Sequence, residues 1–215
     1  IVNLLEKPTQ GEITYWDGSA LSRLDCGRRR ELSRQMAMIF QDPLLFRRSV
    51  RENIAYGLKL RRVRKEEREA RVEHVLGRLA LAELAGRDAA TLSGGEARKA
   101  ALGRALVLRP RLLLLDEPLS NIDLAGRREL LQLFAELVRE EGITALYVSH
   151  DHHEVLEVAD RLAVLLDGTL LQVGTPGEVF SRPAFAEVAA FLGAENILEG
   201  RVVSAGAGVA EIEVE

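Results

Sequence analysis

Four consecutive leucines, Leu112 to Leu115, run directly into two acids, Asp116 and Glu117. A continuous apolar run of this length is typical of a parallel strand that is buried on both faces. In an open parallel sheet, ligands bind outside the carboxyl ends of the strands. The run therefore predicts a central strand that delivers two carboxylates to a ligand site.

Apolar strands and amphipathic helices alternate along most of the chain. The segments MAMIF (36–40) and ITALYVS (143–149) predict two more strands, the second also buried, which lead into Gln41 and His150. Apolar residues recur at helical spacing between the strands, and this alternation predicts a three-layer α/β fold. Shorter elements are also expected, namely the last turn of a helix at 1–5 and strands at 12–16, 162–166 and 169–173.

Two blocks depart from this alternation. Residues 44–92 carry no strand signal and predict a helical subdomain inserted into the α/β domain. Near residue 195 the sequence becomes β-like and stops in mid-pattern. The expected organisation is an α/β domain over residues 1–194, followed at 195–215 by the beginning of a truncated small β domain.

Composition narrows the class of protein. Hydrophobic residues make up 47% of the 215-residue chain and charged residues 29%, which indicates a globular rather than a disordered protein. The net charge of −4 argues against generic binding of nucleic acid. Cys26 is the single cysteine, so a disulfide within the chain and a multi-cysteine zinc site are excluded. No apolar run reaches the roughly 18 residues of a membrane helix.

The residues at the predicted strand ends suit phosphoryl transfer, in which a protein positions the reactants and neutralises charge. Asp116 can hold Mg²⁺, because hard cations prefer carboxylate oxygens. Glu117 can act as general base on a water, while His150 can hold Glu117 and donate to the γ-phosphate. Gln41 can reach both metal and water. Taken singly, an acid pair can also be a helix cap and a histidine a structural residue, but their joint order favours a site.

The segment LSGGE (92–96) adds an anion site of a different kind. Ser93 is expected to be the N-cap of a helix. Gly94 and Gly95 leave the backbone bare at the helix N-terminus, where N–H groups and the helix dipole bind anions. The segment can bind phosphate but has no lysine, and a site that already has its own phosphate loop would have no use for it. This suggests that the segment serves the nucleotide of another subunit.

In this order, Gln41, LSGGE, LLLLDE (112–117), SNID (120–123) and His150 resemble the nucleotide-binding subunit of an ATP-binding cassette (ABC) transporter. The resemblance implies a P-loop NTPase-like fold, ATP and Mg²⁺ as ligands, and a head-to-tail homodimer that sandwiches two ATP molecules. By this resemblance, Gln41 is the Q-loop glutamine, and Ser93, Gly94, Gly95 and Glu96 belong to the signature. Asp116 is the metal-binding Walker B aspartate and Glu117 is the catalytic base. Asp123 is the D-loop residue and His150 is the switch histidine.

The same resemblance implies partners and a place in the cell. Two transmembrane permease subunits would contact the helical subdomain, an extracellular solute-binding protein would act indirectly, and no nucleic acid is expected. The protein would lie peripherally on the cytoplasmic face of the membrane. GTPGEVFSRP (174–183) resembles importers with a C-terminal regulatory β-barrel of the oligonucleotide-fold type, and GAENILEGRV (193–202) resembles the tungstate, molybdate and sulfate importers among them.

The chain departs from the family pattern in one large respect. It contains no G-x-x-x-x-G-K-[ST] loop and no Gly-Lys dipeptide. In the family this loop precedes a helix whose tail resembles IVNLLEKPT, so we expect it upstream of Ile1 and expect the 215 residues alone to be inactive. Smaller departures are Glu-Ala-Arg-Lys at 96–99 instead of Gln-Gln-Arg, and SNID instead of SALD.

Other functions stay open. The importer could carry iron, a polyamine or a sugar instead of an oxyanion. A soluble ABC ATPase acting on DNA or ribosomes is a second class, although the sequence lacks the long coiled coils, zinc cysteines or tandem cassette of such proteins. A third possibility is a non-catalytic chain that regulates partners by occupying the dimer face.

Overall fold

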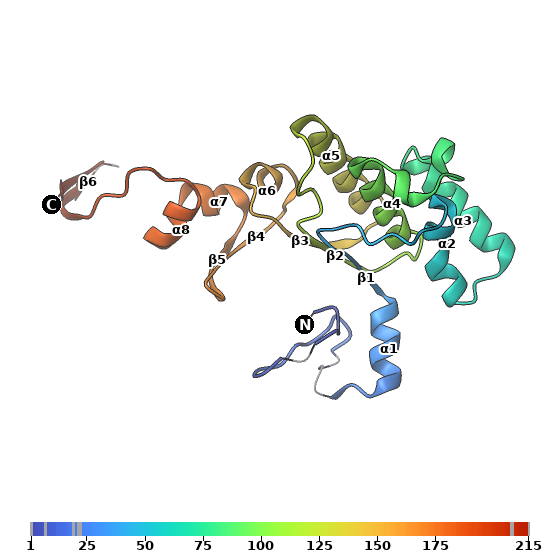
Figure 1. Ribbon diagram of the computed structural model, residues 1–215. Coiled ribbons are helices and arrows are strands. Elements are labelled where there is room, and N and C mark those ends of the chain that lie inside the picture. Colours follow the sequence, from blue (N-terminus) through green and yellow to red (C-terminus); the bar gives the residue numbers. More distant parts are fainter. Residues whose placement is uncertain (1, 7, 19, 21–22, 207–208, 215) are drawn as a thin grey trace. The chain divides into compact units, whose positions relative to one another are not determined.

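The computed structural model describes residues 2–6, 8–18, 20, 23–206 and 209–214. The chain divides into two compact units, residues 1–150 and 151–215. Most of the predicted helices and three parallel strands lie in the first unit (Figure 1). The predicted domain boundary at 195 falls inside the second unit and stays a prediction.

A three-stranded parallel sheet forms the centre of the first unit, in the order β1 (Met36–Ile39), β2 (Leu112–Asp116) and β3 (Thr144–Val148). Leu115 of β2 pairs with Ile39 on one side and with Tyr147 on the other. Leu113, Leu114 and Leu115 are buried, as their apolar run predicted. The three strands therefore end together at one edge of the sheet.

Helices fill most of the sequence between β1 and β2. They are α2 (Val50–Leu60), α3 (Lys65–Arg78), two short 3₁₀ turns (Ala82–Leu84 and Ala89–Thr91) and α4 (Gly94–Leu106). Ser49 and Ser93 begin α2 and α4 with capping boxes, which satisfy backbone N–H groups at both helix starts. The expected helical block between residues 44 and 92 thus consists of two helices and two turns. α5 (Leu124–Glu140) follows β2 and ends before Gly142.

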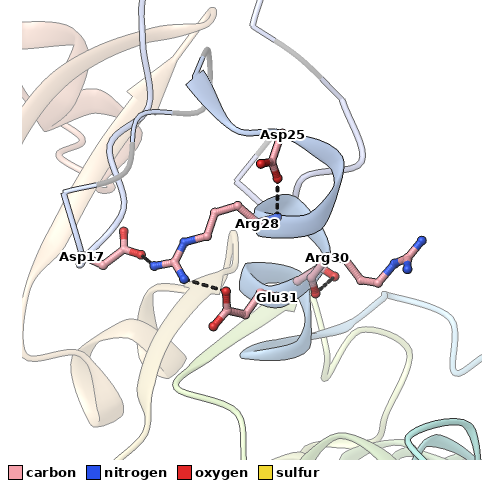
Figure 2. Close-up of polar contacts among 6 residues, drawn as sticks. Asp17, Asp25, Arg28, Arg30 and Glu31 are labelled. Atoms are coloured by element: carbon pink, nitrogen blue, oxygen red, sulfur yellow. Dashed lines mark hydrogen bonds and ion pairs between the residues drawn. The ribbon is translucent and has the colours of Figure 1, made fainter.

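The segment before β1 is held by charged contacts (Figure 2). Asp25 caps α1 (Cys26–Arg34) by accepting from the Arg28 N–H at 2.7 Å. The Arg28 guanidinium pairs with Asp17 and also with Glu31, the latter at 2.6 Å. These pairs are exposed, so their contribution to stability is small.

The second unit contains α6 (His152–Val158), an antiparallel pair β4 (Leu162–Leu166) and β5 (Thr169–Gly174), α7 (Pro176–Ser181), α8 (Ala186–Phe191), and a hairpin of β6 (Gly200–Gly206) and β7 (Val209–Val214). Val164, Val179 and Val188 form its small core. The expected strands at 162–166 and 169–173 are confirmed. The β6–β7 hairpin accounts for the β-like pattern after residue 195.

Three sequence expectations were wrong. Of the helical turn expected at 1–5, residues 2–5 form turns and bends instead, with a φ of +66° at Leu4, because a single helical turn has few internal hydrogen bonds; Ile1 lies outside the described residues. The strand at 12–16 is reduced to one bridge between Thr14 and Ala20, since an isolated hairpin is marginal. β3 is not buried: Leu146 and Val148 are 49% and 51% exposed, since side chains on the faces of a sheet are buried only where another layer packs on them.

Within the described residues, no helix is both long and apolar enough to cross a membrane.

The close contact of α4 with α2 and α3 gives a stability prediction. A Cβ atom at Gly103 would lie 2.9 Å from Leu79 Cδ1 and 3.1 Å from Ile54 Cδ1, whereas a Cβ at Gly77 meets nothing within 4 Å. We expect Gly103→Ala to lower the free energy of unfolding by about 1–3 kcal/mol through overpacking. Gly77→Ala should raise it by about 0.5–1 kcal/mol. Urea denaturation of both variants measures the difference, and a stabilised Gly103→Ala would contradict this packing.

Candidate functional site

The carboxyl edge of the sheet brings together residues that are far apart in the sequence. Asp116 is the last residue of β2, and Gln41 follows the end of β1 by two residues. His150 follows the end of β3 by two residues. The aligned register of the strands places these three ends side by side. The sheet edge predicted to hold a site therefore exists.

Glu117 and His150 are in direct contact. Glu117 Oε1 lies 3.0 Å from His150 Nδ1, and the two side chains are 30% and 75% exposed. The backbone also holds Glu117, because its N–H donates to the Val148 carbonyl at 3.0 Å. The predicted contact between the acid and the histidine is therefore present, in a place that solvent can reach.

The backbone of Glu117 is strained. Its φ is +43°, in the left-handed region that non-glycine residues rarely occupy. Strain of this kind costs of order 1–3 kcal/mol and concentrates at functional sites. The turn is closed by a bond of 3.2 Å from the Ser120 N–H to the Glu117 carbonyl. The Glu117 side chain that leaves this strained turn contacts His150.

Asp116 and Gln41 are exposed and offer oxygen atoms at the same edge. Among the described residues, no group of three or more histidine, cysteine or acidic side chains could enclose a metal ion. Mg²⁺ typically keeps several waters and takes only one or two carboxylates together with the phosphates of its substrate. Asp116 and Gln41 therefore offer the kinds of oxygen ligand that suit Mg²⁺ arriving with a nucleotide.

The signature segment forms the N-terminus of α4, as predicted. The Ser93 side chain accepts from the Glu96 N–H at 3.3 Å, and Glu96 accepts from the Ser93 N–H at 2.7 Å. Hydrogen bonds to the Glu96 carboxyl, first from the Ser93 backbone N–H and then from the Ser93 hydroxyl, lower its pKa. Gly94 and Gly95 are the first two residues of the helix, where N–H groups have no intrahelical partner. The Glu96 carboxylate is engaged in its own cap, and binding of an anion at this helix end stays a prediction.

Asp123 has a structural role in this chain. It is the N-cap of α5, and its Oδ1 accepts from the Gly126 N–H at 2.7 Å. Two residues earlier, Asn121 has a φ of +60°. The contact of Asp123 with a nucleotide, which the resemblance implied, stays a prediction.

Comparison with known proteins identifies the family. The chain matches the family described as ABC transporter over residues 1–120. The chain belongs to the ABC transporter family. The solved structure of cbiO1 from Clostridium perfringens, described as part of the ABC transporter complex cbiONQ, is 29% identical with a TM-score of 0.77, over 84% of this chain and 72% of that one. The expected α/β fold of an ABC ATPase is thereby confirmed.

Curated relatives of this ABC chain carry different solute names. It is 45% identical over 187 residues to the molybdate/tungstate import ATP-binding protein WtpC of Thermococcus kodakarensis, covering 85% of this chain and 57% of the relative. It is 46% identical over 170 residues to the Fe(3+) ions import ATP-binding protein FbpC of Streptomyces coelicolor, covering 79% and 49%. It is 45% identical over 188 residues to the sn-glycerol-3-phosphate import ATP-binding protein UgpC of Cupriavidus pinatubonensis, covering 84% and 51%. The chain thus spans about half the length of these relatives.

Arg98 is a buried charged residue of α4 that the sequence marked only as a departure from the ABC signature. It lies one helical turn after Gly94 and is only 6% exposed. Ala101, Leu102 and Ala105 follow it at positions i+3, i+4 and i+7 and are buried too. A charged residue on the apolar face of a helix was the available signal.

The backbone strain at Glu117 predicts an effect on the free energy of unfolding, which can be measured without an ATPase assay. Glycine tolerates positive φ, whereas alanine keeps the steric cost. We therefore expect Glu117→Gly to unfold with a free energy about 1 kcal/mol higher than that of Glu117→Ala. The same pair at Glu136, exposed within α5, should show the opposite order by about 1 kcal/mol. Urea denaturation measures both pairs, and the same order at both positions would refute stored strain at Glu117.

Proposed function

We propose that this chain is part of the ATP-binding subunit of an ABC importer that couples ATP hydrolysis to the uptake of a solute. The observation that carries the proposal is the 3.0 Å contact between Glu117 Oε1 and His150 Nδ1, beside Asp116 at the carboxyl edge of the sheet. An acid, a histidine and a metal-binding carboxylate at one edge suit phosphoryl transfer. The names of the import ATP-binding relatives support the direction of transport.

In this proposal, the residues at the sheet edge divide the tasks of ATP hydrolysis. Glu117 accepts a proton from the attacking water as general base. His150 fixes the Glu117 carboxylate through Nδ1 and donates to the γ-phosphate through Nε2. Asp116 and Gln41 hold Mg²⁺, which when bound neutralises charge on the phosphates.

The proposed active state is a head-to-tail homodimer. Ser93, Gly94, Gly95 and Glu96 of one subunit would bind the γ-phosphate of ATP held by the other, because the N-terminus of α4 offers unpaired N–H groups. Asp123 would lie near the same interface. The phosphate loop of each site would come from outside the 215 residues.

The exposed side chains of Leu44 and Phe46 form an apolar patch at the start of the helical block. We propose that this patch contacts a permease subunit, of which the transporter would have two. Leu44 is 65% exposed and Phe46 42%. Phe46 stacks against Tyr56 and lies under the Arg104 guanidinium, 5.7 Å from the ring centre. Exposed apolar side chains rimmed by a charge are typical of protein contacts. The protein would then sit peripherally on the cytoplasmic face of the membrane, with an extracellular solute-binding protein acting through the permease.

The transported solute is proposed to be an oxyanion of the tungstate, molybdate and sulfate class. The segment GAENILEGRV and the similarity to WtpC support this choice. The relatives named for iron and for glycerol phosphate have nearly equal identity, so identity alone does not select the solute.

The catalytic role of Glu117 can be tested in the intact protein. Glu117→Gln keeps the shape but removes the base, so we expect ATP hydrolysis to fall by about 10²–10⁴-fold while ATP-bound dimers accumulate. Phosphate release measures turnover and gel filtration with ATP measures dimers. Glu136→Gln, on the exposed face of α5, is the matched control and should leave turnover unchanged. Wild-type turnover in Glu117→Gln would overturn the proposed role.

The solute can be tested in the native cell. Deletion of the gene should lower cellular molybdenum and tungsten, measured by mass spectrometry, while cellular iron stays constant. The wild-type gene should restore uptake and the Glu117→Gln gene should not. Loss of iron or polyamine uptake instead would contradict the oxyanion proposal but would leave the importer proposal standing.

A further inference from the structure

Arg98 is the one arginine among the described residues that is buried, with 6% of its surface exposed. Within that part of the chain it makes no ion pair. Burial lowers its pKa from the ordinary value, and the nearby Asp42 carboxylate opposes this shift. Arginine nevertheless keeps its charge in proteins. A buried charge without an acidic partner needs hydrogen bonds to compensate for lost water.

Backbone carbonyls supply these hydrogen bonds. Arg98 Nε donates to the Pro118 carbonyl at 2.7 Å. Arg98 Nη2 donates to the Ser120 carbonyl and, at 3.4 Å, to the Gln41 carbonyl. The guanidinium also lies next to the signature, since a Cβ at Gly94 would be 3.8 Å from Arg98 Nη1.

The three carbonyls belong to the two loops that carry the proposed catalytic groups. Pro118 and Ser120 follow Glu117 in the strained turn, and the Ser120 N–H closes that turn on the Glu117 carbonyl. Gln41 is itself the proposed metal and water ligand. Arg98 projects from α4, whose first residues form the signature. One side chain thus connects three segments that are separated by 57 and 20 positions in the sequence.

We propose that Arg98 is a positioning residue of the ATPase site, which holds the Glu117 turn and the Gln41 loop in register with the signature helix. The inference rests on the proposed function. It adds a physical link through which a movement of the Glu117 turn, the Gln41 loop or the signature helix would reach the other two. Arginine suits this task because its planar fork presents several donors in fixed directions. Hydrogen bonds from a charged donor are also stronger than neutral ones.

The test uses the intact protein and the variant Arg98→Met, which keeps the length of the side chain but removes every donor. Because small displacements of catalytic groups are costly, we expect kcat for ATP to fall by about 10–100-fold. The KM for ATP should stay within about threefold, since the lost contacts orient groups rather than bind nucleotide. Hydrogen exchange should speed up in residues 40–44 and 116–122 together.

Arg61→Met is the matched control. Arg61 also donates to two backbone carbonyls, those of Arg34 at 2.6 Å and Leu108 at 3.4 Å, and burial lowers its pKa in the same way. Neither carbonyl belongs to the site. We expect the control to leave kcat and the exchange of both site segments unchanged. If Arg98→Met does not fold, Arg98→Lys is expected to show the same selective pattern at smaller amplitude.

The outcomes separate the two proposals. If the parent protein hydrolyses ATP and an Arg98 variant has wild-type kcat, the positioning role is wrong. Faster exchange spread evenly over the first unit, or equal effects of the Arg61 variant, would also overturn it. If the parent protein hydrolyses no ATP, the proposed function fails, and the exchange of residues 40–44 and 116–122 alone decides whether Arg98 links the two loops.

Discussion

Parallel pairing through the buried leucines of β2 determines where every proposed catalytic group lies. Leu113, Leu114 and Leu115 are 0–6% exposed and pair with β1 on one side and β3 on the other. A slip of one residue would turn buried side chains to the opposite face, so burial fixes the register strongly. Because the register is fixed, the three strands end together, and the polar residues at or just after their ends lie at one edge of the sheet.

Beyond the strand ends, polar side chains bonded to the backbone shape the site. Ser93 and Glu96 cap α4, Asp123 caps α5, and Arg98 binds three loop carbonyls. Buried backbone groups outside helices and sheets need such partners. The irregular segments at the sheet edge thereby obtain defined positions, which catalysis by orientation requires.

The spread of solute names among the relatives has a physical explanation. In the proposed function, the described site handles phosphate, metal and water, and those groups are the same whatever solute is carried. Function follows from sites rather than from folds. Similarity in the ATP-binding chain therefore identifies the motor of a transporter more readily than its cargo.

The sequence by itself determined the type of most elements and the position of Gln41, Asp116 and His150 at or just after the ends of neighbouring strands. Hydrophobic period and cap residues predicted β1, β2, α4 and α5, because these signals are local. The contact of Glu117 with His150 was also anticipated, since both follow apolar strands that belong to one sheet.

Tertiary structure alone decided the rest. The exposure of β3 depends on what packs on the faces of the sheet. The absence of a helix at residues 2–5 reflects the few internal hydrogen bonds of a single turn, which the sequence period does not report. Arg98 appeared in the sequence as an ordinary charged residue, and only the fold shows its guanidinium on the carbonyls of Gln41, Pro118 and Ser120. Such contacts join distant segments through backbone atoms, which every residue carries, so no pattern of side chains encodes them.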